Sequence, residues 1–192
     1  GSALKKELHG LLCPPSFPIP KPGTLSWDEA HACLFDLAGL KTEYELFFKT
    51  LPSHTDESRW RIILPKGFAY HKLARLYRLL RVKLNSPNNL NQINLTEEQR
   101  DPDRDGSYAI TMKAVQEVDE DGRYLPREDC QQRSLQGTTL LEYLFLWLVY
   151  FMVTAKRLDR ENRTLSIGSR VQPNRVPTAG WYVSDRELWI SD

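Results

Sequence analysis

The sequence contains little cysteine. Only three cysteines occur among 192 residues, and Cys13, Cys33 and Cys130 lie far apart. Because a small secreted domain is normally stabilised by an even set of cysteines at short spacing, this pattern argues against a disulfide framework and favours a reducing compartment. Residues 4–13 are too few and too charged to form a signal peptide. We therefore expect a cytoplasmic protein.

An excess of charge of one sign is also lacking. The 26 Lys and Arg residues nearly balance the 25 Asp and Glu residues, which leaves a formal net charge of +1. Such a chain has no overall field that would attract nucleic acid or an anionic membrane, so any attraction of this kind must come from a local patch. We therefore expect no membrane partner.

No hydrophobic run is long enough to cross a membrane. The longest uncharged apolar segment covers residues 143–155, whereas a membrane-spanning helix needs about 20 residues. We predict instead a buried helix over about residues 138–157, with Thr138 or Thr139 as its N-cap. Its middle is apolar on every side, which predicts core positions for Leu144, Trp147 and Phe151.

The motifs of several common enzyme classes are absent. The chain has no GxxxxGK[S/T] phosphate loop, no GxGxxG dinucleotide-binding turn and no GxSxG nucleophile turn. Neighbouring carboxylates, such as those of Glu97 and Glu98, lie in turn-like sequence where we expect solvated side chains. The sequence therefore predicts no catalytic residue and no cofactor, although catalytic groups can also assemble from distant positions.

Two groups of residues carry potential metal ligands. Residues 101–106 match the first half of a calcium-binding loop, but the twelfth position, which needs a bidentate carboxylate, is Met112. We favour an acidic turn here and keep calcium as the alternative. His31 and Cys33 would lie about 200° apart on a helix and cannot face one metal ion. We therefore predict no zinc site at the four candidate ligands His9, Cys13, His31 and Cys33.

A proline-rich segment marks the N-terminal part of the chain. Residues 14–23 contain five prolines, which remove amide donors and fix φ, so the segment can form neither a helix nor a central strand. We assign residues 1–25 to an arm and residues 26–192 to one globular domain. The arm either lies along its own domain, which we favour, or is a ligand for an aromatic groove of another protein.

The rest of the chain alternates between helical and strand-like patterns. Ser26 and Glu29 form a capping box for a helix over residues 27–38, with a second short helical stretch near residues 42–50. We expect an α+β or α/β protein in which a mixed sheet packs against helices, in the rough order α-β-α-β-α-β-β-β. The later elements are a strand at 60–64, a helix at 70–84, a loop at 85–106 with a possible helical turn at 96–99, a strand at 107–118, the helix at 138–157, and strands at 164–167, 180–183 and 187–190.

The helix predicted over residues 70–84 is a candidate site. Leu73, Leu76 and Leu80 recur at helical spacing, and the segment contains no acidic residue. Its basic residues could contact the phosphates of a nucleic acid, or they could form an ordinary solvated face. These candidate nucleic-acid-binding residues are His71, Lys72, Arg75, Arg78, Arg81 and Lys83.

A second candidate site follows the predicted buried helix. Gly168 interrupts a strand pattern, as glycine does where another group approaches the backbone closely. The planar guanidinium of Arg170 suits an anion, and Ser169 and Asn162 could bind the same ligand. In the alternative, which we favour, Arg170 pairs with Asp159 or another internal carboxylate and attaches the turn to the sheet.

From residue 60 onward the chain carries several distinctive stretches. They are WRIILP at 60–65, DP at 101–102 with GSYAI at 106–110, GTTLLE at 137–142, LDRENRTLSIGSR at 158–170, and VP at 176–177 ahead of Trp181. In this order they resemble a group of uncharacterised predicted bacterial proteins. The resemblance covers about residues 60–192 and implies no fold, activity or substrate.

These observations favour a non-enzymatic binding or interaction domain with an unknown partner. The partner could be a protein, or a nucleic acid that binds through a local basic patch. One alternative is a nucleic-acid-binding module that uses the basic helix at 70–84. The other is an enzyme with a site near the C-terminal strands.

Overall fold

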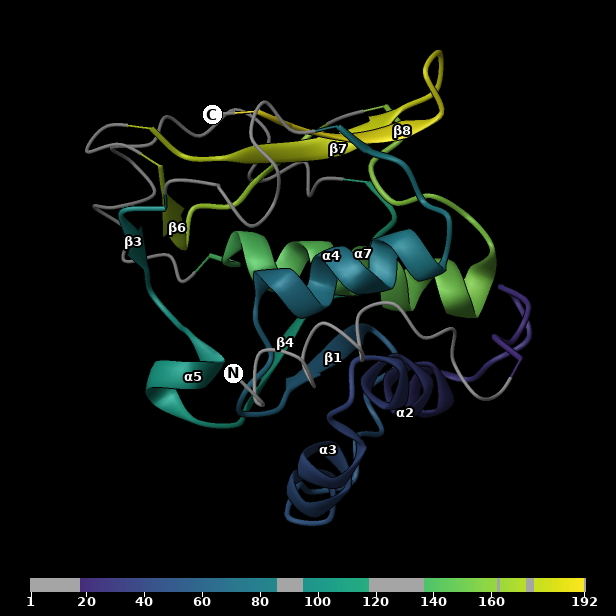
Figure 1. The fold of residues 1–192 in the computed structure, drawn as a ribbon, viewed down its shortest axis with the longest axis vertical. Helices are drawn as coiled ribbons and strands as arrows, with labels where there is room; N and C mark the ends of the chain where they lie inside the picture. The colour runs from purple at the N-terminus through teal and green to yellow at the C-terminus, as the bar shows by residue number, and fades with distance from the viewer. Residues whose placement is uncertain (1–17, 86–94, 118–136, 162, 172–174, 192) are drawn as a thin grey trace, which may run out of the picture.

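The structure, a computed structural model, describes residues 18–85, 95–117, 137–161, 163–171 and 175–191 (Figure 1). It has the α+β architecture that the sequence predicts, with helices packed against a mixed sheet. In chain order, the elements are α2 (Trp27–Leu37), α3 (Lys41–Phe48), β1 (Arg59–Leu64), α4 (Tyr70–Leu79), β2 (Leu84–Asn85), β3 (Glu97–Glu98), α5 (Pro102–Asp105), β4 (Tyr108–Lys113), α7 (Leu140–Thr154), β5 (Thr164–Leu165), β6 (Ser169–Arg170), β7 (Thr178–Tyr182) and β8 (Glu187–Ser191).

The apolar helix α7 forms the centre of the structure. Every residue from 140 to 150 is buried, because α2, α4, β1 and β7 all contact this helix. Thr139 and Glu142 form a capping box at its start, in which each side chain accepts a hydrogen bond from the other residue's amide. The predicted buried helix is confirmed, with Leu144 and Trp147 fully buried and Phe151 partly buried.

Within the described ranges, no helix has both the length and the apolar character needed to cross a membrane.

Helix α2 begins where the sequence predicts. Ser26 is its N-cap, and the predicted capping box with Glu29 is present. Gly39 follows the helix at φ +71°, a left-handed conformation that favours glycine. The buried face of α2 then packs against α7 through aromatic rings, because Phe35 stacks on Phe145 with ring centroids 4.8 Å apart.

The mixed sheet has four strands in the order β2-β8-β7-β5. Strand β2 runs parallel to β8, while the β7–β8 and β5–β7 pairs are antiparallel. The strands predicted at 180–183 and 187–190 are present as β7 and β8, which pair as an antiparallel hairpin. The sheet covers one side of the helical layer formed by α4 and α7 (Figure 1).

The other strands of the described chain lie outside this sheet. β1 pairs only with β4, and β3 pairs only with β6, which gives two further ribbons of two antiparallel strands. The strand predicted at 60–64 is present, and its residues 62–64 are buried. It pairs with β4 and so does not belong to the mixed sheet. Its hydrophobic pattern indicates burial, whereas its partner depends on how the whole chain folds.

Helix α4 is shorter than predicted. It ends at Leu79, and Arg81 takes a left-handed backbone conformation with φ +55°. The Val82 amide donates back to the carbonyl of Tyr77 at 3.0 Å, which closes the helix and directs the chain into β2. Arg81 and Lys83 consequently lie beyond the helix and not on its outer face. The turn leads the chain from α4 into β2, which pairs with β8.

Two short elements replace part of the predicted loop at 85–106. Residues 97–98 form β3, so the possible helical turn at 96–99 is wrong. A strand of two residues has no detectable period of its own and forms here because β6 supplies the partner. Asp101 then caps α5, as its carboxylate accepts hydrogen bonds from the amides of Asp103 and Arg104.

The described part of the proline-rich arm lies along α7. The Gly23 amide donates to the Met152 carbonyl at 2.7 Å, and Ile19 packs against the core. A Cβ atom at Gly23 would approach that of Ala155 to 3.1 Å, so glycine permits this close contact. Residues 1–17 lie outside the described ranges.

Candidate functional site

The predicted basic face is present on α4. Leu73, Leu76 and Tyr77 are buried against the core, and the opposite side of the helix faces outward (Figure 1). His71 and Arg78 are exposed there and Arg75 is partly exposed, whereas the Lys72 ammonium donates to the Ala38 carbonyl at 3.4 Å. Arg81 and Lys83 are exposed just beyond the helix. Unlike Lys72, the other five basic residues form no side-chain hydrogen bond with a described residue. We call them the basic row: His71, Arg75, Arg78, Arg81 and Lys83.

The basic row has no described counter-ion. The ion pairs among described residues involve Asp36, Asp56, Asp105 and Glu142, none of which pairs with α4. Nor does any side chain of the row form a hydrogen bond with another described residue. Residues 70–84 also contain no carboxylate. No carboxylate of the described ranges therefore neutralises the positive charge of the row, which could attract an anion.

The second predicted site does not form a single cluster. Ser169 is fully buried, where its hydroxyl accepts from the Leu140 amide at 2.8 Å and donates to the Glu98 carboxylate at 3.1 Å. The Arg170 guanidinium donates instead to the carbonyls of Ile167 and Ser169. Neighbouring residues of a strand point to opposite faces, which separates these two side chains. Asn162 lies outside the described residues.

The favoured pairing of Arg170 with a carboxylate is not found: no ion pair joins Arg170 to Asp159 or to another described carboxylate. The buried Asp159 carboxylate accepts from the hydroxyl of Tyr143 at 2.7 Å and from that of Thr164. Burial raises the pKa of Asp159 to about 6, and the two hydroxyl donors oppose that shift. The two hydroxyls take the place of Arg170 at the Asp159 carboxylate. The Arg170 guanidinium donates instead to the carbonyls of its own turn.

The close approach predicted at Gly168 is confirmed. Its amide donates to the Thr138 carbonyl at 3.0 Å, and an added Cβ would lie 3.0 Å from the carbonyl oxygens of Gly137 and Thr138. Any side chain at this position would push apart β6 and the start of α7. The glycine therefore positions Ser169 beside the polar network described next.

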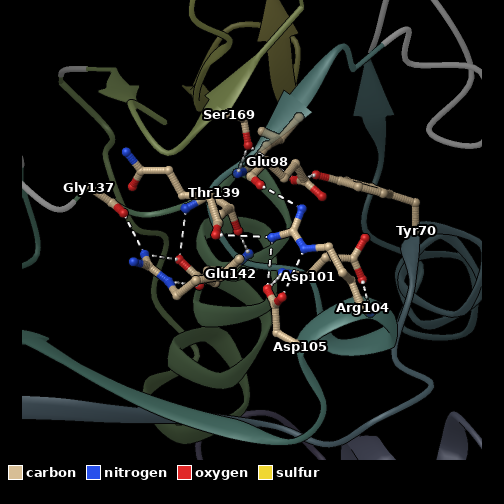
Figure 2. A network of polar contacts seen from close by, with 12 residues as sticks. Tyr70, Glu98, Asp101, Arg104, Asp105, Gly137, Thr139, Glu142 and Ser169 are labelled. Carbon is tan, nitrogen blue, oxygen red and sulfur yellow. Dashed lines mark hydrogen bonds and ion pairs between the residues drawn. The ribbon is translucent and has the colours of Figure 1, made fainter.

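A polar network joins the start of α7 to β3 and β6 (Figure 2). The Glu142 carboxylate is fully buried and receives two hydrogen bonds from the Arg100 guanidinium, at 2.7 and 2.9 Å. It also accepts from the Thr139 amide at 2.7 Å, while Arg100 donates to the Gly137 carbonyl. The buried charge is thus compensated by one cation and by hydrogen bonds, as a stable buried ion pair requires.

Glu98 lies in the same network without a cation. One oxygen of its carboxylate, Oε1, accepts from the hydroxyls of Tyr70 at 2.6 Å and Ser169 at 3.1 Å (Figure 2). Burial raises the pKa of Glu98 to about 7, and the two hydroxyl donors partly oppose this shift. The expectation that both Glu97 and Glu98 are solvated is therefore wrong for Glu98, which the pairing of β3 with β6 places inside the network.

The network is better suited to holding the fold than to catalysis. Its only serine, Ser169, is fully buried and cannot reach a substrate, and the Glu142 carboxylate is fully occupied. What it can do chemically is bind and release one proton at Glu98 near neutral pH. Sequence reasoning could not detect this residue, because β6 and α4, which supply its partners, are distant in the chain.

We expect the Glu98 carboxyl to make stability depend on pH. A pKa raised from 4.5 to about 7 means that the folded state holds the proton more tightly. The contribution of this carboxyl to stability is therefore greatest below pH 4.5 and falls as the pH rises towards 7. Glu98→Gln, whose amide oxygen can still accept both hydroxyls, should stabilise the protein by about 1–3 kcal/mol at pH 8 and by almost nothing at pH 4.5.

Urea denaturation of both proteins at the two pH values measures this difference. The matched control is Glu97→Gln at the exposed neighbouring position, which should change stability equally at pH 4.5 and pH 8. An equal effect of Glu98→Gln at both pH values would show that Glu98 does not titrate in the expected range.

In the described ranges, no group of three or more His, Cys, Asp or Glu side chains is arranged to hold a metal ion. His31 is fully buried, with Nδ1 donating to the Trp27 carbonyl and Nε2 accepting from the Ile63 amide. Burial lowers the pKa of His31 to about 4, so the ring is a neutral core residue. His9 and Cys13 lie outside the described residues.

The surface clefts of the described part of the molecule include two near sequence-predicted or aromatic residues. One, of about 800 Å³, lies between the start of α2, the segment after α3 and the start of β1, with Trp27 and Trp60 stacked in its wall. The other, of about 510 Å³, lies near the C-terminal strands and is lined by Arg160, Arg163 and residues 180–184. Its serine, Ser184, forms no hydrogen bond with a base there, so the cleft shows no assembled nucleophile.

Comparison of this chain with protein-family models, with curated proteins and with solved structures gave no match.

Proposed function

We propose that this protein is a non-enzymatic nucleic-acid-binding domain that contacts phosphates through the basic row. One observation carries the proposal: the cationic side chains on and after α4 have no counter-ion among the described residues. Charged helix faces are often only solvated. A row without interspersed carboxylates nevertheless differs from the surroundings of Lys41, Arg59 and Arg104, each of which has an acidic partner.

The physical basis of such binding is the release of counterions. Each phosphate that a lysine or arginine neutralises frees condensed cations into solution, so affinity falls as salt rises. The basic row carries four full charges besides His71. We therefore expect the logarithm of the binding constant to fall with the logarithm of the salt concentration with a slope of about −3 to −4.

The test is a fluorescence anisotropy titration with DNA and RNA oligonucleotides at several salt concentrations. The variant Arg75→Ala with Arg78→Ala should weaken binding about 10-fold at low salt and reduce the magnitude of the salt slope by about 2. Neither side chain has a described partner, so the loss of binding would not result from a lost internal contact.

The matched control removes the same charge elsewhere. Lys49→Ala with Arg59→Ala lowers the net charge equally, on the side of α3 and β1, and should leave affinity nearly unchanged. Equal weakening by both double variants would show only nonspecific attraction. No binding of the unmodified protein at low salt would overturn the proposal.

We also infer a cytoplasmic location in a bacterial cell. The resemblance over residues 60–192 supports a bacterial source, and the scarcity of cysteine supports a reducing compartment. Among the described residues, Cys33 is a free thiol.

A further inference from the structure

The two faces of the mixed sheet differ in character. Opposite residues of an antiparallel pair share a face, and the pairs Ala179–Ile190 and Trp181–Leu188 face the helices. Ala179, Leu188 and Ile190 are buried, and Trp181 stacks on Trp147 of α7. The helices α4 and α7 therefore cover this inner face (Figure 1). The outer face carries the alternate pairs, which are Thr178–Ser191, Gly180–Trp189 and Tyr182–Glu187.

A strip of aromatic and polar side chains crosses the outer face. The rings of Tyr182 and Trp189 come from neighbouring strands, with centroids 5.3 Å apart, and both remain partly exposed. The Arg163 guanidinium, just before β5, lies 4.9 Å from the centre of the Tyr182 ring. At the other end, the Asn85 amide in β2 donates to the Glu187 carboxylate at 3.3 Å. We call these five residues the outer strip.

Cationic side chains lie at both ends of the outer strip. Arg160, Glu161 and Arg163 line the cleft beside Tyr182. The Arg163 guanidinium donates to the Tyr182 hydroxyl, and neither arginine forms an ion pair with a described carboxylate. At the opposite edge, Lys83 immediately precedes β2, where Asn85 is level with Trp189. A chain that crosses the sheet along the strip would therefore reach Lys83 and Arg81 and then the rest of the basic row.

We propose that the outer strip binds single-stranded nucleic acid, with a base stacked on Trp189 beside Tyr182 and flanking phosphates on Arg160 and Arg163. This inference rests on the proposed function and names its substrate class. Bases offer their faces to aromatic rings only when they are unpaired, and such stacking tolerates any sequence because every base has a π-face. The donors and acceptors of Asn85 and Glu187 that their mutual hydrogen bond does not use lie where they could bind the edge of a stacked base.

A second copy of this chain is a poorer occupant of the strip. A two-fold contact through this face would bring each strip against the same patch of the other copy. The guanidinium groups of Arg160 and Arg163, which form no ion pair with a described carboxylate, would then lie within one interface, where like charges repel. The phosphates of a nucleic acid complement these groups, and for this reason we favour nucleic acid.

The experiment compares one fluorescein-labelled 12-nucleotide mixed-sequence strand, as DNA and as RNA, with the duplex of the same sequence. Titrations use the full chain, its Trp189→Ala and Tyr182→Ala variants, and Val183→Ala as a matched control at an exposed position of the same hairpin. Thermal melting establishes that each variant is folded. Trp189→Phe and Tyr182→Phe keep a ring at each position and distinguish stacking from other effects.

We expect each alanine variant to weaken single-strand binding about 5- to 100-fold. Both phenylalanine variants should retain most of the affinity, duplex binding should be unchanged, and Val183→Ala should behave as the unmodified protein. Preference for DNA or for RNA supports the inference in either case, and a preference for RNA would add a contact to the 2′-hydroxyl.

Two kinds of failure can be separated. If no oligonucleotide binds at low salt, the proposed function fails and this inference fails with it. If oligonucleotides bind and respond to Arg75→Ala with Arg78→Ala, but not to Trp189→Ala or Tyr182→Ala, only the outer strip is overturned. The inference is equally overturned if sedimentation shows a dimer that Trp189→Ala dissociates while single-strand binding stays unchanged.

Discussion

Arg100→Ala is expected to reduce the free energy of unfolding by about 3–5 kcal/mol. The substitution leaves the Glu142 carboxylate, which is fully buried, without the cation that binds both of its oxygens. Removing one partner of a buried ion pair is far more costly than losing a surface pair, because the remaining charge stays out of water. Urea denaturation at pH 7 with circular dichroism measures the difference.

The matched control is Arg104→Ala, which also removes an arginine that pairs with a carboxylate. Arg104 and Asp105 are well exposed, with 55% and 39% of their side-chain surfaces accessible, so water screens their interaction. The control should cost only about 1 kcal/mol. Adding Glu142→Gln to Arg100→Ala should recover part of the stability, since no buried charge then remains. An Arg100→Ala cost no larger than that of Arg104→Ala would contradict the buried-charge argument.

Phe145→Ala is the other substitution with a large expected effect, a loss of about 3–5 kcal/mol. Phe145 is fully buried in α7, where it stacks on Phe35 and lies edge-on to Phe68 and His31. Truncation removes these contacts and leaves a cavity between α2 and α7 that rigid neighbours cannot fill. Thermal and urea denaturation at a fixed pH measure the loss.

Two further variants test whether the loss of stability in Phe145→Ala comes from the cavity. Phe145→Leu keeps most of the apolar volume and should cost clearly less than Phe145→Ala. Leu46→Ala, at a position of α3 that is 63% exposed, should change stability by less than about 0.5 kcal/mol. A cost for Phe145→Ala close to that of Leu46→Ala would mean that α7 is not enclosed on the α2 side.

Helix α7 also connects the core to the two proposed binding surfaces. It contacts α4, which carries much of the basic row, and β7, which carries Tyr182 of the outer strip. The basic row and the outer strip are thus held by the same buried helix. We therefore expect that destabilising substitutions in α7 affect both surfaces together, whereas substitutions within one surface affect only that surface.

Local features of the sequence determined much of the helical structure. Ser26 with Glu29, and Thr139 with Glu142, are capping boxes whose partners lie three residues apart, so sequence alone reveals where α2 and α7 begin. The all-round apolar character of residues 143–155 indicated burial for the same reason, since it is a property of consecutive residues. The alternation in the last two strands likewise revealed the hairpin of β7 and β8.

Only the tertiary structure decided the features that depend on distant partners. β3 exists because β6 pairs with it, and this pairing buries Glu98 beside Tyr70 and Ser169. The end of α4 at Leu79 depends on the pairing of β2 with β8. The outer strip combines Asn85, Arg163, Tyr182, Trp189 and Glu187 from four strands or their ends. A sequence pattern describes which face a residue occupies within its own element, whereas contacts between elements follow from the free energy of the whole fold.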